Sequence, residues 1–243
     1  PPRSTPLYSS AASDVYKRQV ERRSIRVKLI DRLPPSGCKI LAKNSSFYTN
    51  LTKNEKIVFE KKVQYFINSK IFTASEGYAA TEEMKVSIAA ASVQITFKLD
   101  TLSNSIFNHI HVLAGPQENV VQNQSMRNSV KINWKEFLDG FATPDDGKNE
   151  GLKTIASVLI KDYHLQEKGY KLFSEKKYKN WELAAMEEAN DFQGGIFFNF
   201  KTDNTLRNEY FAQSIVYFFE LPRAMKIKYP KNYKALCVLL NQN

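Results

Sequence analysis

Cysteine and histidine are both scarce in this chain of 243 residues. The two cysteines, Cys38 and Cys237, lie far apart in the sequence, so neither a disulfide framework nor a metal site built on cysteine is expected. A reducing compartment is the simplest interpretation of so few thiols, and we expect a cytoplasmic protein. The three histidines, His109, His111 and His164, leave few imidazole ligands from which a metal centre could be built.

Long apolar runs are absent as well. The longest run, 86–97, is interrupted by Ser87, Ser92, Gln94 and Thr96, so we expect no transmembrane helix. Hydrophobic residues make up 42% of the chain and charged residues 25%. This balance is typical of a globular domain with a large core.

Positive charge is in excess, with a formal net charge of +10. Basic residues gather in two places, namely Arg22, Arg23, Arg26, Lys28 and Arg32, and then Arg223, Lys226, Lys228, Lys231 and Lys234. Such clusters are compatible with a nucleic-acid or anionic-membrane partner. No zinc knuckle, RNA-recognition motif or glycine-rich phosphate loop accompanies them, so nucleic-acid binding is not expected as the main function.

The first residues of the chain do not look like part of the native protein. Residues 1–19 are small, polar and aperiodic, and they resemble translated sequencing adapter, so we treat them as a non-native tail that packs little against the rest. The native N-terminus would then be missing, which leaves a signal or anchor open. Residues 20–47 are basic and contain Pro34-Pro35, which indicates an arm or lead-in, and residues 48–243 are assigned to the folded domain.

Periodicity predicts a mainly helical α+β fold in a single domain with a few short strands. The clearest helix start is the capping box formed by Thr52 and Glu55. The helices expected are 54–66, a helix opened by Thr81-Glu82-Glu83 that includes 86–97, 134–141 closed by Gly140, 149–164, 166–190, 206–220 stopped by Pro222, and 233–240. The β-prone runs are 110–113 and 130–132, and 196–200 is either a strand or a buried loop.

Two segments resemble a known family when they are taken together. Residues 146–159 run from a Gly-x-Asn loop into an amphipathic helix, and residues 208–222 contain Glu-Tyr-Phe-Ala followed by Phe-Phe-Glu-Leu-Pro. This order resembles the Mlc titration factor A family of zinc-dependent peptidases, from residue 48 to the C-terminus. Weaker similarities support it at 54–66, 86–97, 109–116, 129–134 and 229–236. The resemblance implies a zincin-like architecture.

The residues that carry the chemistry of that family are altered here. In the family, the helix reads His-Glu-x-x-His and a later glutamate is the third zinc ligand. By alignment, Lys153 replaces the first histidine, Thr154 the general base and Ser157 the second histidine, while Glu209 matches the third ligand. A protonated lysine has no lone pair for a metal, and threonine is no base near neutral pH. We therefore expect no catalytic residue, no metal ligand set and no cofactor, although the family binds zinc.

Other catalytic constellations find little support in the sequence. His109 and His111 alternate on an expected strand and could face one side, but no acidic residues are placed to complete a zinc site, so ordinary strand or surface histidines are the simpler interpretation. A serine triad is not excluded by composition, yet there is no Gly-x-Ser-x-Gly.

Two functions follow as hypotheses. The first is a catalytically inactive homologue that binds a protein or peptide or has a regulatory or structural role. Protein binding has a precedent in the family, which is named for binding a transcriptional repressor. The second is a zinc aminopeptidase, as the family implies, with an unrecognised metal arrangement. We further expect the helices 149–164 and 206–220 to pack together, with Lys153, Thr154, Ser157 and Glu209 converging and Lys153 pairing with Glu209 in place of the metal.

Overall fold

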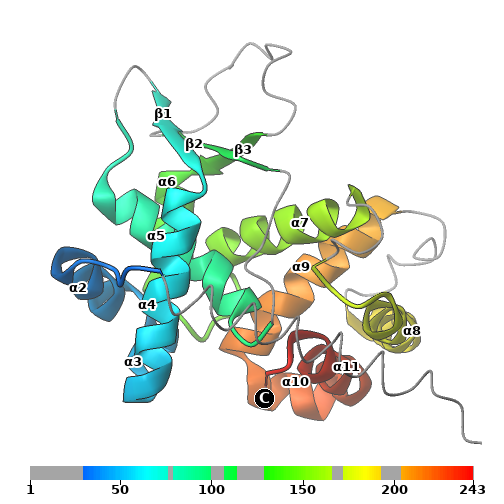
Figure 1. Cartoon of the computed structure of the whole chain (residues 1–243). Coiled ribbons are helices and arrows are strands. Elements are labelled where there is room, and N and C mark those ends of the chain that lie inside the picture. Colours follow the sequence, from blue (N-terminus) through cyan, green and yellow to red (C-terminus); the bar gives the residue numbers. More distant parts are fainter. Residues whose placement is uncertain are drawn as a thin grey trace, which may run out of the picture.

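The computed structural model describes residues 30–75, 79–99, 107–113, 129–165, 172–192 and 204–242. These residues form a mainly helical α+β domain with one small sheet (Figure 1), which confirms the expected fold class. The elements are α2 (Pro35–Asn44), α3 (Ser46–Thr49), α4 (Lys53–Asn68), β1 (Ile71–Ala74), α5 (Glu82–Thr96), β2 (His109–Leu113), β3 (Ser129–Asn133), α6 (Trp134–Ala142), α7 (Glu150–Leu165), α8 (Glu175–Phe192), α9 (Asn204–Glu220), α10 (Pro222–Lys228) and α11 (Pro230–Leu240).

Local capping explains where the first long helices start. The Thr52 side chain accepts a hydrogen bond from the backbone N–H of Glu55, and the Glu55 carboxylate accepts one from the backbone N–H of Thr52, so the predicted capping box is confirmed. Thr81 caps α5 in the same way by accepting from the backbone N–H of Met84. These caps satisfy N–H groups that have no partner inside their helices.

The sheet is parallel and has the order β1-β2-β3. Both expected strands are present, and β1 is an additional one that periodicity did not predict. Four residues with a half-buried pattern carry too little alternation to be distinguished from the end of α4, which precedes them. Its pairing with β2, in which Ile71 lies opposite His109, makes it a strand.

Two hydrophobic clusters hold the helices together. The larger one spans α5, the sheet and α6 to α11, and its largest fully buried side chains include Trp181, Tyr210 and Phe211. The smaller one joins α2, α3 and α4 to the outer face of α5, around Phe59. Because α5 contributes to both clusters, it is buried nearly all round, which explains the near-continuous apolar run in its sequence.

The packed core begins well before residue 48, where the domain boundary was expected. Leu33 and Leu41 are buried in the smaller cluster. The Arg32 guanidinium reaches the buried Glu60 carboxylate at 2.6 Å, and the Tyr48 hydroxyl donates to the other oxygen of the same carboxylate at 2.7 Å. Within the expected arm, residues from about 32 onward are therefore part of the folded domain.

Four further expectations differ from the structure or lie outside its described part. The long charged helix starts at Glu175 rather than near residue 166, because Leu172 and Phe173 turn into the core first. Gly140 does not close α6, which continues to Ala142. Residues 1–19 and 196–200 lie outside the described part of the chain. No helix among the described residues is long and apolar enough to cross a membrane.

Candidate functional site

Helices α7 and α9 pack against each other along the centre of the molecule (Figure 1), as the paired motifs predicted. Ile155, Ala156 and Leu159 of α7 belong to the same buried cluster as Phe211 and Ile215 of α9. This packing places the two helices that match the zinc helix and the third-ligand helix of the family side by side.

The loop before α7 is held by its own side chains. The Asn149 side-chain oxygen accepts a hydrogen bond from the Leu152 backbone N–H at 2.7 Å and so caps the helix. The Asp146 carboxylate accepts from the Lys148 backbone N–H at 2.8 Å. Gly147 has φ +72, and an added Cβ atom there would lie 2.8 Å from the Tyr217 ring, so the position requires glycine for both its conformation and its space.

The end of α9 fixes this loop from the other side. The Glu220 carboxylate accepts from the Asn149 side-chain amide at 2.9 Å and from the Gly147 backbone N–H at 3.1 Å. Gln213, two turns earlier on α9, donates to the Gly147 carbonyl at 3.0 Å. Burial raises the pKa of Glu220 above its ordinary value, and the hydrogen bonds from Asn149 and Gly147 oppose that shift.

The four positions equivalent to the family site do not form the expected ion pair. Lys153, Thr154 and Ser157 are half-buried on α7, whereas Glu209 is exposed on α9. The Lys153 ammonium lies 3.7 Å from the Glu150 carboxylate, one turn away on its own helix. Glu209 makes no ion pair or hydrogen bond with any described residue, so the prediction that Lys153 pairs with Glu209 is wrong. An exposed carboxylate is solvated by water and does not need a buried cation to stabilise it.

The donor set at these positions does not suit a catalytic zinc. Three protein ligands are typical of such a centre, and Glu209 is the only one of the four side chains with a ligating group of the usual kind. In the described ranges, no group of three or more His, Cys, Asp or Glu side chains is placed to hold a metal ion.

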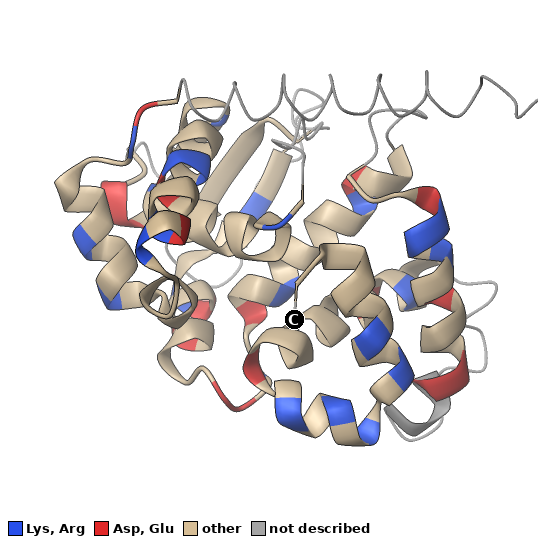
Figure 2. Cartoon of the chain, turned by 60° about the horizontal axis from the view of Figure 1, so that its bottom comes forward, with Lys and Arg blue, Asp and Glu red and all other residues tan. Residues whose placement is uncertain are grey.

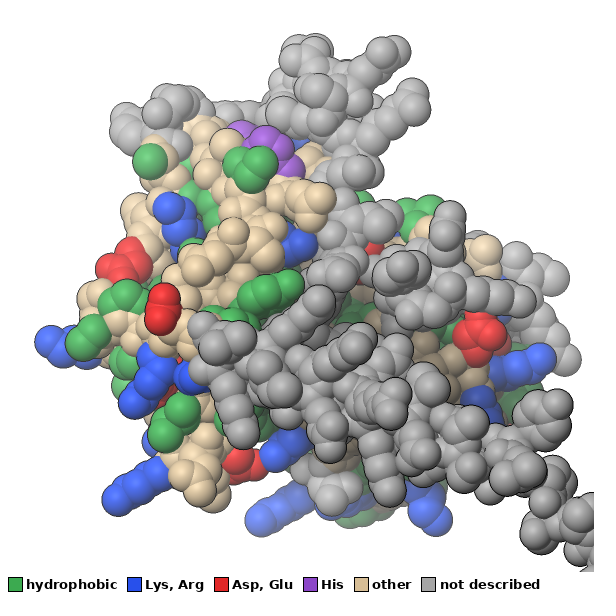
Figure 3. Space-filling model, viewed as in Figure 1, with side chains coloured by type: hydrophobic (Ala, Val, Ile, Leu, Met, Phe, Trp, Pro, Cys, Tyr) green, Lys and Arg blue, Asp and Glu red, His purple; other side chains and the backbone are tan. Residues whose placement is uncertain are grey.

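The two strand histidines lie on one face of β2, as their spacing predicted, and Figure 3 shows histidine at the surface near the sheet. The Thr73 hydroxyl and His111 Nδ1 are 2.8 Å apart. Burial, and then the nearby Lys131 and His109, lower the pKa of His111. The third histidine, His164, is on α7 and lies 3.3 Å from the Tyr178 hydroxyl.

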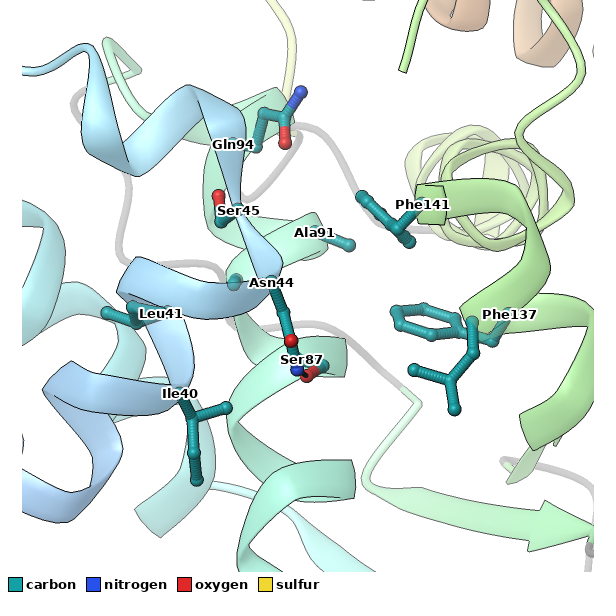
Figure 4. A pocket seen from close by; sticks show the side chains of 11 residues that line it. Ile40, Leu41, Asn44, Ser45, Ser87, Ala91, Gln94, Phe137 and Phe141 are labelled. Carbon is teal, nitrogen blue, oxygen red and sulfur yellow. Dashed lines mark hydrogen bonds between the residues drawn. The ribbon is translucent and has the colours of Figure 1, made fainter. Parts of the chain in front are cut away.

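A groove separates α2, α3 and α5 from α6 and the ends of α7 and α9. Figure 4 shows one end of it, with Phe137 and Phe141 of α6 facing side chains of α2 and α5. A neighbouring cavity of about 330 Å³ shares Asn44, Ser45, Gln94 and Phe141 with it and is also lined by Asn149 and Glu220. This size falls within the range of small-ligand sites. We call the whole feature the α2–α6 groove.

Gln94 of α5 borders both parts of the α2–α6 groove. It is only 8% exposed, and its side-chain amide makes no hydrogen bond with a described residue. The Gln94 amide is not among the buried polar atoms that lack a partner, so it reaches the groove, where a ligand could replace the water around it. Sequence reasoning missed this residue, because a lone glutamine in an apolar helix gives no signal of a binding site.

The fold and the two interlocked helix motifs define the scaffold of a metallopeptidase. The family model of the glucose-regulated metallo-peptidases M90 matches residues 17–239, so the chain belongs to this family, as the resemblance indicated. The match also covers the segment 20–47 that had been assigned to an arm. No curated protein matches the chain.

Proposed function

We propose that this chain is a catalytically inactive member of the M90 metallopeptidase family and that it acts by binding a protein or peptide. The observation that carries the proposal is the replacement of both zinc-helix histidines and the general base by Lys153, Ser157 and Thr154. The ion pair of Lys153 with Glu150 supports it, since an ammonium group has no lone pair to offer a metal ion.

The α2–α6 groove is the part of the molecule that we assign to the bound segment. A peptide backbone offers both a donor and an acceptor, which matches the two unpartnered ends of the Gln94 amide. Phe141 and Phe219 supply apolar wall for a side chain of the same segment. Polar side chains such as Asn44, Ser45 and Glu220 line much of the cavity, and they suit the polar backbone of a peptide.

The alternative is an active zinc aminopeptidase, and Glu209 is the residue that favours it. Zinc content of the purified protein, measured by elemental analysis, and cleavage of an aminopeptidase substrate distinguish the two. We expect less than stoichiometric zinc and no cleavage. Zinc-dependent cleavage that is lost in Glu209→Ala would overturn the proposal of an inactive enzyme.

Binding needs its own test. The probe is N-acetyl-leucyl-phenylalaninamide, and the readout is the side-chain amide resonance of Gln94 in nitrogen-15 NMR spectra. We expect this resonance to move on titration and the affinity to fall in Gln94→Leu. An unchanged resonance, with shifts confined to residues outside the groove, would reject the groove as the peptide site.

A further inference from the structure

The last two helices carry positive charge without any negative charge. Residues 222–240 include five cations, Arg223, Lys226, Lys228, Lys231 and Lys234, and no Asp or Glu. In Figure 2, which brings the lower side of Figure 1 forward, this part of the ribbon shows blue positions and no red ones. These two helices therefore contribute five positive charges to a chain whose formal net charge is +10.

Exposed aliphatic side chains accompany these cations. Arg223, Lys226 and Ile227 share one face of α10, at spacings of three and four residues, and Ile227 is 85% exposed. On α11, Lys234 and Val238 are one turn apart, and Val238 is 51% exposed. We call these five residues, together with Lys231, the α10–α11 basic surface.

Among the described residues, nearby acidic groups neutralise this surface only in part. Glu187 pairs with Lys231, and the Glu188 carboxylate accepts from the first backbone N–H groups of α11. Glu220 is engaged by the loop before α7. Neither Arg223 nor Lys234 forms an ion pair or hydrogen bond with a described residue, so their charges face solvent.

We propose that the α10–α11 basic surface binds the anionic face of a phospholipid bilayer. Clusters of lysine and arginine on an amphipathic helix are attracted to acidic headgroups, and each cation near such a surface strengthens binding by about fivefold. The exposed Ile227 distinguishes this partner from nucleic acid, since acyl chains offer an apolar phase that phosphate backbones lack. The helices lie on the membrane and do not span it.

The experiment is co-sedimentation of the whole chain with vesicles of phosphatidylcholine that contain phosphatidylserine, compared with phosphatidylcholine alone. We expect binding only to the anionic vesicles and its loss when salt is raised from about 0.1 M to about 1 M. Arg223→Glu/Lys234→Glu should weaken binding by at least about 25-fold, which is the fivefold factor applied to two cations. Ile227→Thr should weaken it several-fold at about 0.1 M salt, because it removes apolar contact with the bilayer.

Matched variants separate this surface from net charge and from misfolding. Lys39→Glu/Lys135→Glu changes the same charge at exposed lysines whose side chains have no described partner, on α2 and α6. Ile71→Thr is the equivalent change on β1, where the side chain is 59% exposed. Both should bind as the parent chain does, and thermal melts should show all variants folded. Equal loss in the control pair, no sedimentation by the parent chain, or tighter binding to duplex DNA at the same ionic strength would overturn the proposal.

Discussion

Glu220, at the end of α9, and the Asn149 amide, at the start of α7, are joined by a hydrogen bond of 2.9 Å. Each residue belongs to one of the two motifs that carry the family resemblance. The two motifs therefore have a structural role that does not depend on a metal, because this hydrogen bond holds the loop before α7 against the end of α9. The zinc-helix positions can thus change while the scaffold around them keeps its geometry.

Removing the Glu220 carboxylate should destabilise this arrangement. In Glu220→Ala, the Asn149 amide and the Gly147 backbone N–H both lose their acceptor, and we expect a loss of about 2–3 kcal/mol in the free energy of unfolding. Urea denaturation measures this loss. Asn149→Ala should cost a similar amount because it also removes the helix cap. In a double-mutant cycle, strict additivity of the two changes would show that the pair is not coupled.

A second carboxylate, Glu188 of α8, should stabilise α11 from outside that helix. It accepts from the backbone N–H groups of Lys231 and Asn232, both at 2.9 Å, as an N-terminal cap would. We expect Glu188→Ala to lower the free energy of unfolding by about 1–2 kcal/mol. Glu187→Ala is the matched control, since it removes only an exposed ion pair and should cost much less. Equal losses in the two variants would contradict the capping role.

The capping box of α4 should make stability depend on pH in the acid range. Hydrogen bonds from Lys98, and then from Thr52, lower the pKa of Glu55 to about 2 from its ordinary value of 4.5. Because the folded state holds the ionised form, the stabilisation is present above the ordinary pKa and is lost as pH falls toward about 2.

The variant that tests this is Glu55→Gln. We expect the difference in unfolding free energy between the parent chain and Glu55→Gln to be largest above pH 4.5 and to shrink as the pH approaches 2. Denaturation curves at a series of pH values give this difference. A difference that stays constant from neutral pH to about pH 3 would show that Glu55 keeps an ordinary pKa.

Strong local signals made most of the fold predictable. The capping residues Thr52 and Thr81 and the helical periodicity that follows them predicted α4 and α5 nearly to their ends. The strand β1 was missed because a strand of four residues is defined by its neighbour and not by its own pattern. The folded role of the segment that contains Leu41 was missed for a similar reason, since its basic residues concealed the apolar face that it buries.

The site was less predictable than the fold. Resemblance located Lys153, Thr154, Ser157 and Glu209, and it placed them on two helices that do pack together. The resemblance did not predict the ion pairs of these residues. Lys153 pairs with Glu150, one turn away on the same helix, and Glu209 faces water. Side-chain pairing depends on rotamers and exposure, which a motif does not specify. Glu220 belongs to the Phe-Phe-Glu-Leu-Pro motif, but its role in holding the loop before α7 could be recognised only once the position of that loop was known.

Restoring the family residues should restore metal binding, and this is the sharpest test of the assignment. In Lys153→His/Thr154→Glu/Ser157→His, the two imidazoles would lie one turn apart on α7, beside the helix that carries Glu209. Three ligands of this kind suit zinc, which leaves a position for water. We expect one zinc ion per chain by elemental analysis and a zinc-dependent rise in melting temperature, since a ligand that binds only the folded state stabilises it. Adding Glu209→Ala to the triple variant should remove most of the affinity. Adding Glu150→Ala should leave the affinity in place, because Glu150 is not one of the three expected ligands and its partner in the parent chain, Lys153, has been replaced. A triple variant that folds but takes up no zinc would contradict this prediction. It would show that α7 and α9 do not bring residues 153, 157 and 209 to a common centre, so that altered geometry, and not altered residues alone, prevents metal binding.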